Sequence, residues 1–123
     1  MADAAGFLER ARNHLRRVRA AAPDPTDWYD LTIYGFYCVE AAVMAASAHG
    51  GLAVQPNHPA KAQAARDLAA AHGLPDVSGL LGTLNAARKA AAYGDRALPQ
   101  LDPRQLAGDI ERYVEAVAAL IES

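Results

Sequence analysis

The stretch that decides the fold is residues 28–49, which read WYDLTIYGFYCVEAAVMAASAH. Apolar side chains lie on almost every side of a helix formed by this stretch, and such a helix has to be surrounded by other parts of the chain. The preceding segment 24–27 supplies a capping carboxylate, a proline suited to a first turn and an acid near the positive end of the helix dipole. Gly50 and Gly51 follow as a stop signal. The sequence therefore predicts a central helix that ends near residue 49.

Polar residues interrupt the apolar run of this helix at Asp30, Thr32 and Glu40. A membrane span needs about 20 predominantly apolar residues, so we interpret 28–49 as the buried helix of a soluble protein that contacts no membrane. The N-terminal segment lacks the apolar core of a secretion signal. The single cysteine, Cys38, excludes an internal disulfide framework and fits a reducing compartment. We therefore expect a cytoplasmic protein.

The composition favours one all-helical domain. The chain has 123 residues, of which 52% are hydrophobic and 21% charged, which is enough apolar material for one core and too little charge for native disorder. Alanine, the strongest helix former, makes up about a quarter of the residues, whereas β-branched and aromatic residues are sparse. The formal net charge of -2 gives no overall attraction to nucleic acid, so any such contact has to come from a local patch. We expect residues 1–123 to form a single domain.

Four further helices are indicated by apolar spacing and by capping residues. They are expected at residues 4–22, from a cap at Asn57 to Gly73, from a cap at Asp76 to Gly94, and from a cap at Asp102 onward. The third helix is thin, with an expected buried face of Ala62, Ala65, Ala69 and His72. Because the connections are short, neighbouring helices should be antiparallel. The predicted fold is all-α, an up-and-down bundle of four to five helices.

A polar group marks the end of the fourth expected helix. Arg88 lies four residues after Leu84, on the face that the leucines of this helix bury. An arginine in an apolar seam is either paired with a carboxylate or open to a cleft. Asn85, Lys89 and Tyr93 recur at intervals of four residues on a neighbouring face. These side chains predict a binding cleft. A solvent-exposed helix end, with the aliphatic part of the Arg88 side chain lying along the surface, explains the same pattern.

Glu40 lies in the most apolar part of the central helix. A carboxylate there has to be protonated, paired or at a cleft, because burying it unpaired is costly. Arg88 is its natural partner, either in a structural ion pair, within the bundle or across a dimer interface, or in a functional site. The four histidines form no metal-binding pattern, so we expect no metal and no cofactor. His58 opens the third helix and could reach a cleft.

The first expected helix carries five arginines, which are Arg10, Arg12, Arg16, Arg17 and Arg19. Against Asp3 and Glu9, they give residues 1–22 a local charge of about +3, which allows electrostatic contact with a phosphate backbone. A solvated outer helix face is the other interpretation of this run.

Three of these features together resemble the HEPN-domain superfamily of small helical bundles. They are the aromatic helix from Trp28 to Ala42, the turn with His58, and the later Leu84-Asn85-x-x-Arg88-x4-Tyr93-Gly94-Asp95. The resemblance covers residues 5–121 in order and spacing. It implies a bundle of four to five helices that forms homodimers, and the family includes RNA-cleaving toxins and RNA-processing components of defence systems. The partner that the resemblance implies for a toxin is a small nucleotidyltransferase antitoxin.

The ribonuclease signature of the family is an arginine followed four to six residues later by a histidine, and the motifs of two protomers meet in a dimer cleft. Here the arginine is Arg88, but Tyr93 stands at the histidine position. A histidine accepts and donates protons at pH 7, whereas a tyrosine, with an ordinary pKa of about 10, is a poor base. His58 could replace the missing base only if folding brings it close to Arg88.

We therefore expect a homodimer that binds RNA, a nucleotide or a partner protein without efficient catalysis. The expected binding residues are Glu40, His58, Asn85, Arg88, Lys89, Tyr93 and Asp95. One alternative is a metal-independent endoribonuclease toxin, in which Arg88 and Tyr93 would be the catalytic residues. The other alternative is a helical dimerisation module without a ligand.

Overall fold

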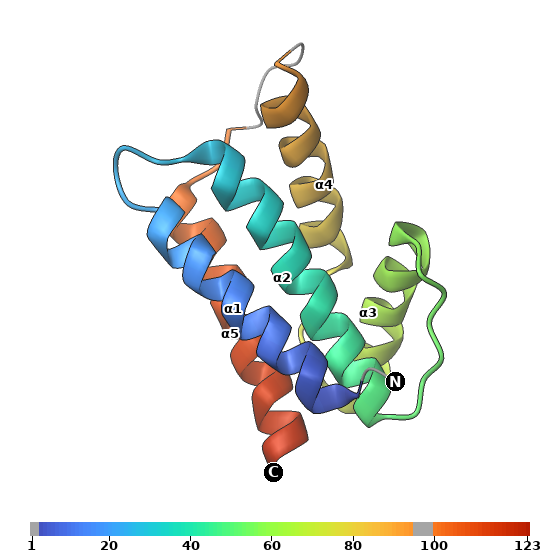
Figure 1. The fold of residues 1–123 in the computed structure, drawn as a ribbon. Helices are drawn as coiled ribbons and strands as arrows, with labels where there is room; N and C mark the ends of the chain where they lie inside the picture. The colour runs from blue at the N-terminus through green and yellow to red at the C-terminus, as the bar shows by residue number, and fades with distance from the viewer. Residues whose placement is uncertain (1–2, 95–99) are drawn as a thin grey trace.

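The computed structural model describes residues 3–94 and 100–123, and it contains five helices within these ranges. They are α1 (Ala4–Ala21), α2 (Trp28–His49), α3 (His58–His72), α4 (Ser78–Tyr93) and α5 (Pro103–Glu122). No strand is found in the described ranges, and the helices pack around a common hydrophobic core (Figure 1). The prediction of an all-α bundle is confirmed.

Side-chain caps begin three of the helices where the sequence predicts them. The side-chain oxygens of Asp27, Asn57 and Asp102 accept backbone N–H groups from the first turns of α2, α3 and α5. The prediction for α4 is wrong by one residue: the helix is preceded by Val77, and the Asp76 carboxylate accepts the N–H of Ser78 at 2.9 Å. An Asp side chain can bond the N–H two residues onward in an Asx turn, which is why α4 begins later than the capping pattern indicates.

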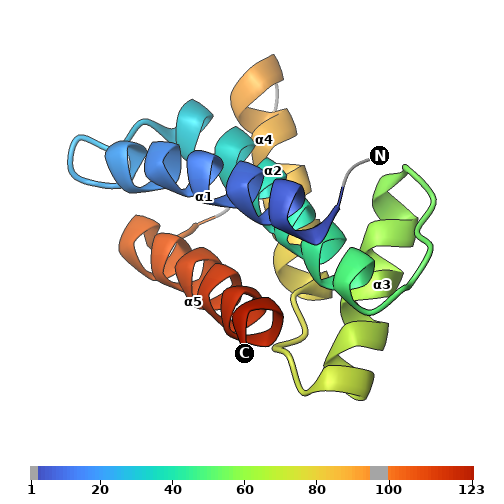
Figure 2. The same cartoon turned by 60° about the horizontal axis from the view of Figure 1, so that its bottom comes forward.

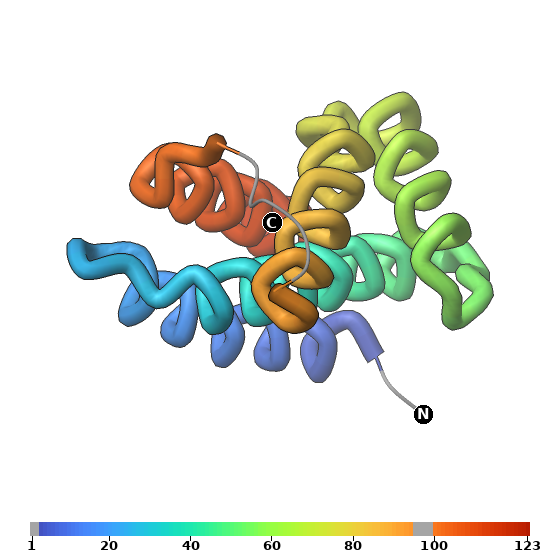
Figure 3. Tube along the Cα trace, turned by 90° about the horizontal axis from the view of Figure 1, so that it is seen from above, coloured from blue at the N-terminus to red at the C-terminus, as the bar shows by residue number. Residues whose placement is uncertain are grey.

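The helices form two layers, and α2 contacts every other helix. Figure 3 shows α1 and α2 side by side in one layer, with α5, α4 and α3 across the other. α1 and α2 are antiparallel, since Cys38 of α2 lies against Ala11 of α1, and Tyr34 lies against Arg17. This arrangement makes α2 the central helix that the sequence predicts.

The expected antiparallel order does not hold between α2 and α3. His58, the first residue of α3, lies beside Glu40 in the middle of α2, and His72, its last residue, lies beside Gly50 just after α2. The two helices therefore run in the same direction. Residues 50–57 allow this because they run back alongside α3 before it begins (Figure 1, Figure 2). As a result, the N-terminus of α3 is placed against the middle of the central helix.

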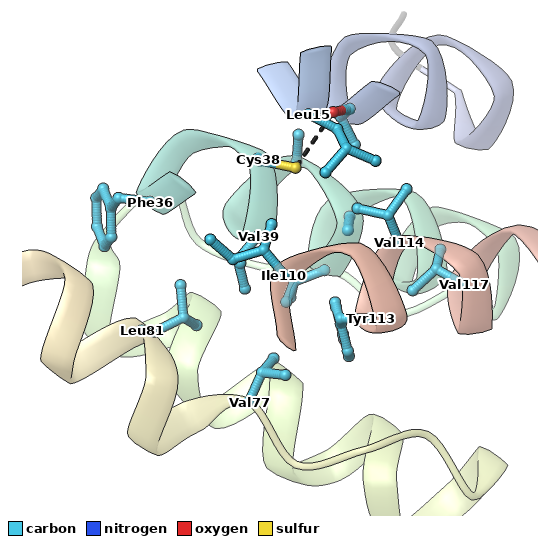
Figure 4. Close-up of a cluster of buried hydrophobic side chains, with 14 of the residues drawn as sticks. Leu15, Phe36, Cys38, Val39, Val77, Leu81, Ile110, Tyr113, Val114 and Val117 are labelled. Atoms are coloured by element: carbon cyan, nitrogen blue, oxygen red, sulfur yellow. Dashed lines mark hydrogen bonds between the residues drawn. The ribbon is translucent and has the colours of Figure 1, made fainter. Parts of the chain in front are cut away.

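The core surrounds α2 and takes buried side chains from both layers. Figure 4 shows part of it, with Tyr113 of α5 inside the cluster and Phe36 of α2 at one edge. At Gly35, α2 approaches both α4 and α5: a Cβ there would lie 2.9 Å from Ile110 Cδ1 and 3.3 Å from Leu84 Cδ2. Both distances are shorter than ordinary van der Waals contact, so glycine lets the three helices meet closely at this point.

The buried face of α3 differs from the predicted one. Ala65 is buried as expected, but the other fully buried residues are Ala64 and Leu68, and the predicted His72 is exposed. Leu68 is the largest apolar side chain of α3. Burying it removes more apolar surface from water than burying an alanine does, so α3 is rotated to bring Leu68 inward.

By length and composition alone, α2 could cross a membrane, and it is the one such helix in the described ranges. However, 72% of its most apolar 18-residue window is buried inside the protein. The core helix of a soluble protein has the same length and composition, because it is apolar on all sides. The burial of α2 is compatible with a soluble protein.

Cys38 of α2 gives a test of the core that depends on pH. Its side chain is fully buried, and Sγ donates to the Ala11 carbonyl oxygen at 3.2 Å (Figure 4). Burial raises the pKa of the Cys38 thiol to about 12, against an opposing effect of the Arg19 charge. In the unfolded chain the thiol ionises near its ordinary pKa of 9.0. The neutral thiol therefore stabilises the fold fully below pH 9, and this contribution is lost as the pH rises toward 12.

We expect the Cys38 contribution to the free energy of unfolding to fall by on the order of 2 kcal/mol between pH 8 and pH 10.5. The reason is that only the unfolded state releases the proton in this range. Urea unfolding of the wild type and of Cys38→Ala at both pH values measures the loss, which should be smaller in the variant. If the free energy of unfolding fell equally in the two proteins between pH 8 and pH 10.5, the expected dependence on Cys38 ionisation would be contradicted.

Candidate functional site

Glu40 lies on the side of α2 that faces the first turn of α3, and only 6% of its surface is exposed. Its Oε2 is 2.7 Å from His58 Nδ1, and its Oε1 is 3.5 Å from Lys61 Nζ. Both carboxylate oxygens are thus paired, which offsets the cost of burying the charge. His58 and Lys61 reach the same carboxylate because residues three apart lie on one face of a helix.

His58 connects Glu40 to Arg88. Its second ring nitrogen, Nε2, is 3.5 Å from Arg88 Nη2. An ionised carboxylate only accepts hydrogen bonds, and a guanidinium only donates them. A neutral imidazole with its proton on Nδ1 satisfies both neighbours, and it leaves the lone pair of Nε2 facing Arg88. The His58 side chain is 49% exposed, so a ligand can reach the ring.

Arg88 is oriented by an amide, an aromatic ring and an imidazole. Its Nε donates to Asn85 Oδ1 at 3.0 Å, and its Cζ lies 4.6 Å from the centre of the Phe36 ring. Phe36 also meets His58 edge-on, with 4.9 Å between the ring centres. Within the described residues, Arg88 contacts an amide, an imidazole and an aromatic ring but no carboxylate. The guanidinium is therefore held in place, and among the described residues no carboxylate neutralises its charge.

A pocket of about 310 Å³ opens beside these side chains. Its polar lining comes from Glu40, His58 and Asn85, and Phe36 forms part of its apolar wall. Other apolar lining residues are Pro59, Ala62 and Leu81. Arg88 borders the pocket, since it contacts three of the lining residues. Apolar walls with one cationic edge suit a ligand that joins an anionic group to a flat or apolar one.

The structure brings together Glu40, His58, Asn85 and Arg88, but it changes their expected pairing. The predicted ion pair between Glu40 and Arg88 is not formed. The parallel course of α3 places His58 between the two charged groups, so Glu40 pairs with His58, and Arg88 reaches the other side of the imidazole. The condition under which His58 could act as a base, proximity to Arg88, is met.

Three predicted site residues lie away from this network or outside the described chain. Lys89 and Tyr93 lie beyond Arg88 in α4, and neither makes a hydrogen bond or an ion pair with a described residue. Tyr93 is in the last turn of the helix and is 69% exposed. Asp95 lies outside the described residues. The contacts of the described chain therefore assign no role to Tyr93.

Phe36 and Lys61 belong to the network, although the sequence alone did not single them out. Phe36 precedes Glu40 by four residues and therefore lies on the same side of α2. Lys61 follows His58 by three residues in α3. Helical spacing from these two predicted site residues is the signal that could have found both.

The arginines of α1 are partly neutralised by α5. Arg12 pairs with Glu122 at 3.0 Å, and Arg19 pairs with Glu111. Arg17 lies instead over the Tyr34 ring of α2. The expected positive charge of α1 is therefore reduced on the side that faces α5 and retained beside Tyr34.

Comparison with protein-family models, curated proteins and solved structures finds no match for this chain. The resemblance to HEPN domains stays a prediction from the sequence. In the part of the chain that the structure describes, no group of three or more His, Cys, Asp or Glu side chains is placed to hold a metal ion. The site has to be interpreted from its own geometry.

Proposed function

We propose that this protein binds a phosphate group of RNA or of a nucleotide at Arg88, beside the pocket that His58 lines. The observation that carries the proposal is the orientation of the guanidinium by Asn85, Phe36 and His58. A fixed guanidinium forms paired, charge-assisted hydrogen bonds with phosphate oxygens. The apolar wall of the pocket offers space for the sugar or base of a phosphate ester.

The resemblance to HEPN domains adds a homodimer to this proposal. α2 begins and α4 ends at the same end of the bundle (Figure 1). Tyr29 and Tyr93, near these two helix ends, are 50% and 69% exposed. Aromatic side chains are enriched where protein surfaces meet. A second copy could cover these tyrosines, and sedimentation at micromolar protein concentration tests for it, with a monomer counting against the shared cleft.

Replacing Arg88 by alanine should weaken binding of single-stranded RNA about ten-fold or more, because charge-assisted hydrogen bonds to phosphate are lost. Fluorescence anisotropy of a labelled oligoribonucleotide at fixed salt measures the affinity. Arg66→Ala is a matched control, since Arg66 is an exposed arginine of α3 that contacts Gln63. Its loss should change the affinity by no more than about two-fold. Wild-type affinity in Arg88→Ala would overturn the proposal.

A second candidate function, metal-independent cleavage of RNA, is favoured by one specific observation. Glu40 contacts Nδ1 of His58, and Nε2 faces Arg88. A carboxylate behind an imidazole favours the tautomer whose outer nitrogen can act as a base. His58 could therefore supply the base that Tyr93 cannot.

The reaction would begin when Nε2 of His58 takes the proton of a ribose 2′-hydroxyl. The 2′-oxygen then bonds to the phosphorus of the phosphate held by Arg88, whose charge stabilises the transition state. The bond from phosphorus to the 5′-oxygen breaks, and this oxygen takes a proton from water. The imidazolium returns its proton to the hydroxide that remains. The products are a 2′,3′-cyclic phosphate and a free 5′-hydroxyl.

A further inference from the structure

We infer that Tyr37 and His14 form a base-stacking subsite beside the phosphate site, and that the ligand is a single-stranded stretch of RNA longer than one nucleotide. This inference rests on the proposed binding of phosphate at Arg88. It adds a second point of contact, which is made by aromatic rings of α1 and α2. That contact holds a base next to the bound phosphate.

The rings of this subsite support one another. The centre of the His14 ring is 6.0 Å from that of Tyr37 and 5.9 Å from that of Tyr34. Tyr37 is 39% exposed, although it belongs to the central helix of the fold. A ring that neighbouring rings already hold in place loses little freedom when a base stacks on it. The exposed part of the Tyr37 ring is therefore already positioned for a base to stack on it.

The Tyr37 ring lies next to the ring that orients Arg88. The ring centres of Tyr37 and Phe36 are 6.1 Å apart. Phe36 is also the ring over which Arg88 lies, and it meets His58 edge-on. A chain with one phosphate at Arg88 can therefore lay an adjacent base on Tyr37 while it stays on the surface of α2.

Positive charge flanks the rings on the side of α1. Arg17 lies over the Tyr34 ring, with Cζ 5.0 Å from the ring centre, and Nη1 donates to Tyr34 Oη at 3.4 Å. Burial, together with the charges of Arg10 and Arg17, lowers the pKa of His14. The His14 ring is therefore neutral at pH 7, and the flanking charge comes from the two arginines.

This arrangement fits a polyanion with exposed bases. Guanidinium groups attract phosphates, and aromatic faces stack bases of any sequence. A duplex keeps its base faces covered by neighbouring base pairs, so it offers none to Tyr37. If two copies of the chain associated through this face, the arginines of one copy would lie against the same arginines of the other. Single-stranded RNA is the occupant that the charges and the rings both favour.

The experiment compares oligoadenylate with an abasic chain of the same length, which keeps the phosphates and lacks the bases. The wild type should bind oligoadenylate about ten-fold more tightly. Tyr37→Ala should remove this preference and leave the affinity for the abasic chain unchanged, whereas Tyr37→Phe should keep the preference. Leu52→Ala is the matched control, because Leu52 is an apolar residue that is 39% exposed, as Tyr37 is, and lies outside the ring cluster, and its loss should alter neither affinity.

Equal binding of the two chains by the wild type, or a preserved preference in Tyr37→Ala, would overturn the subsite and leave phosphate binding at Arg88 standing. Binding of neither chain would overturn the proposed function together with the subsite. Sedimentation of the wild type and of Tyr37→Ala gives a third result. A dimer that this substitution converts to a monomer would show that a second copy covers Tyr37, and it would also overturn the subsite.

Discussion

Replacing Phe36 by alanine should lower the free energy of unfolding by about 3 kcal/mol and also weaken RNA binding. Phe36 is 1% exposed and belongs to the core cluster of Figure 4, so truncation removes buried apolar contacts and leaves a cavity. The loss should lie at the lower end of the range for buried aromatic residues, because Phe36 also lines the open pocket and water can refill part of the space. Urea unfolding followed by circular dichroism measures it.

Phe36→Leu separates the two roles of this ring. Leucine keeps most of the apolar volume, so the stability loss should shrink to about 1 kcal/mol. Arg88 and His58 nevertheless lose the ring that each of them contacts. RNA binding by this folded variant should therefore weaken, and anisotropy at fixed salt measures the change. Wild-type affinity in Phe36→Leu would mean that the ring serves the core alone.

The helices could be predicted from the sequence because capping and apolar spacing act over a few residues. Asp27, Asn57 and Asp102 each accept N–H groups from the turn that follows, and such contacts depend only on neighbouring residues. The direction of α3 could not be predicted in this way. It depends on the course of residues 50–57, and the rotation of α3 depends on which side chain, Leu68 or an alanine, competes better for the core.

The candidate site could be predicted only in part, for a related reason. Glu40 and Arg88 stand out in the sequence because a charged group in an apolar helix needs a partner or a cleft. Their actual partners are set by tertiary structure: α3 runs parallel to α2, and its first turn places His58 and Lys61 against Glu40. No spacing within one helix contains that information. The spacing of four residues between Phe36 and Glu40 places Phe36 on the site's side of α2, but its contacts with Arg88 and His58 again depend on tertiary structure.

Replacing His58 by alanine should lower the rate of RNA cleavage in EDTA about 100-fold or more, because a positioned general base contributes on the order of 10²–10⁴ to such a rate. The assay follows the appearance of 2′,3′-cyclic phosphate ends from a single-stranded substrate. His72→Ala is the matched control. His72 is an exposed histidine at the other end of α3, beside Gly50, and its loss should leave the rate unchanged.

In the proposed cleavage Glu40 would act through His58, since its carboxylate pairs with Nδ1 while Nε2 faces Arg88. Glu40→Gln keeps an oxygen that can accept from Nδ1 but removes the charge that stabilises the imidazolium. It should therefore lower kcat while KM for RNA stays close to that of the wild type, a split that a merely structural residue would not produce. Wild-type protein that binds RNA in EDTA and leaves it intact would exclude cleavage, and Arg88 would then serve binding alone.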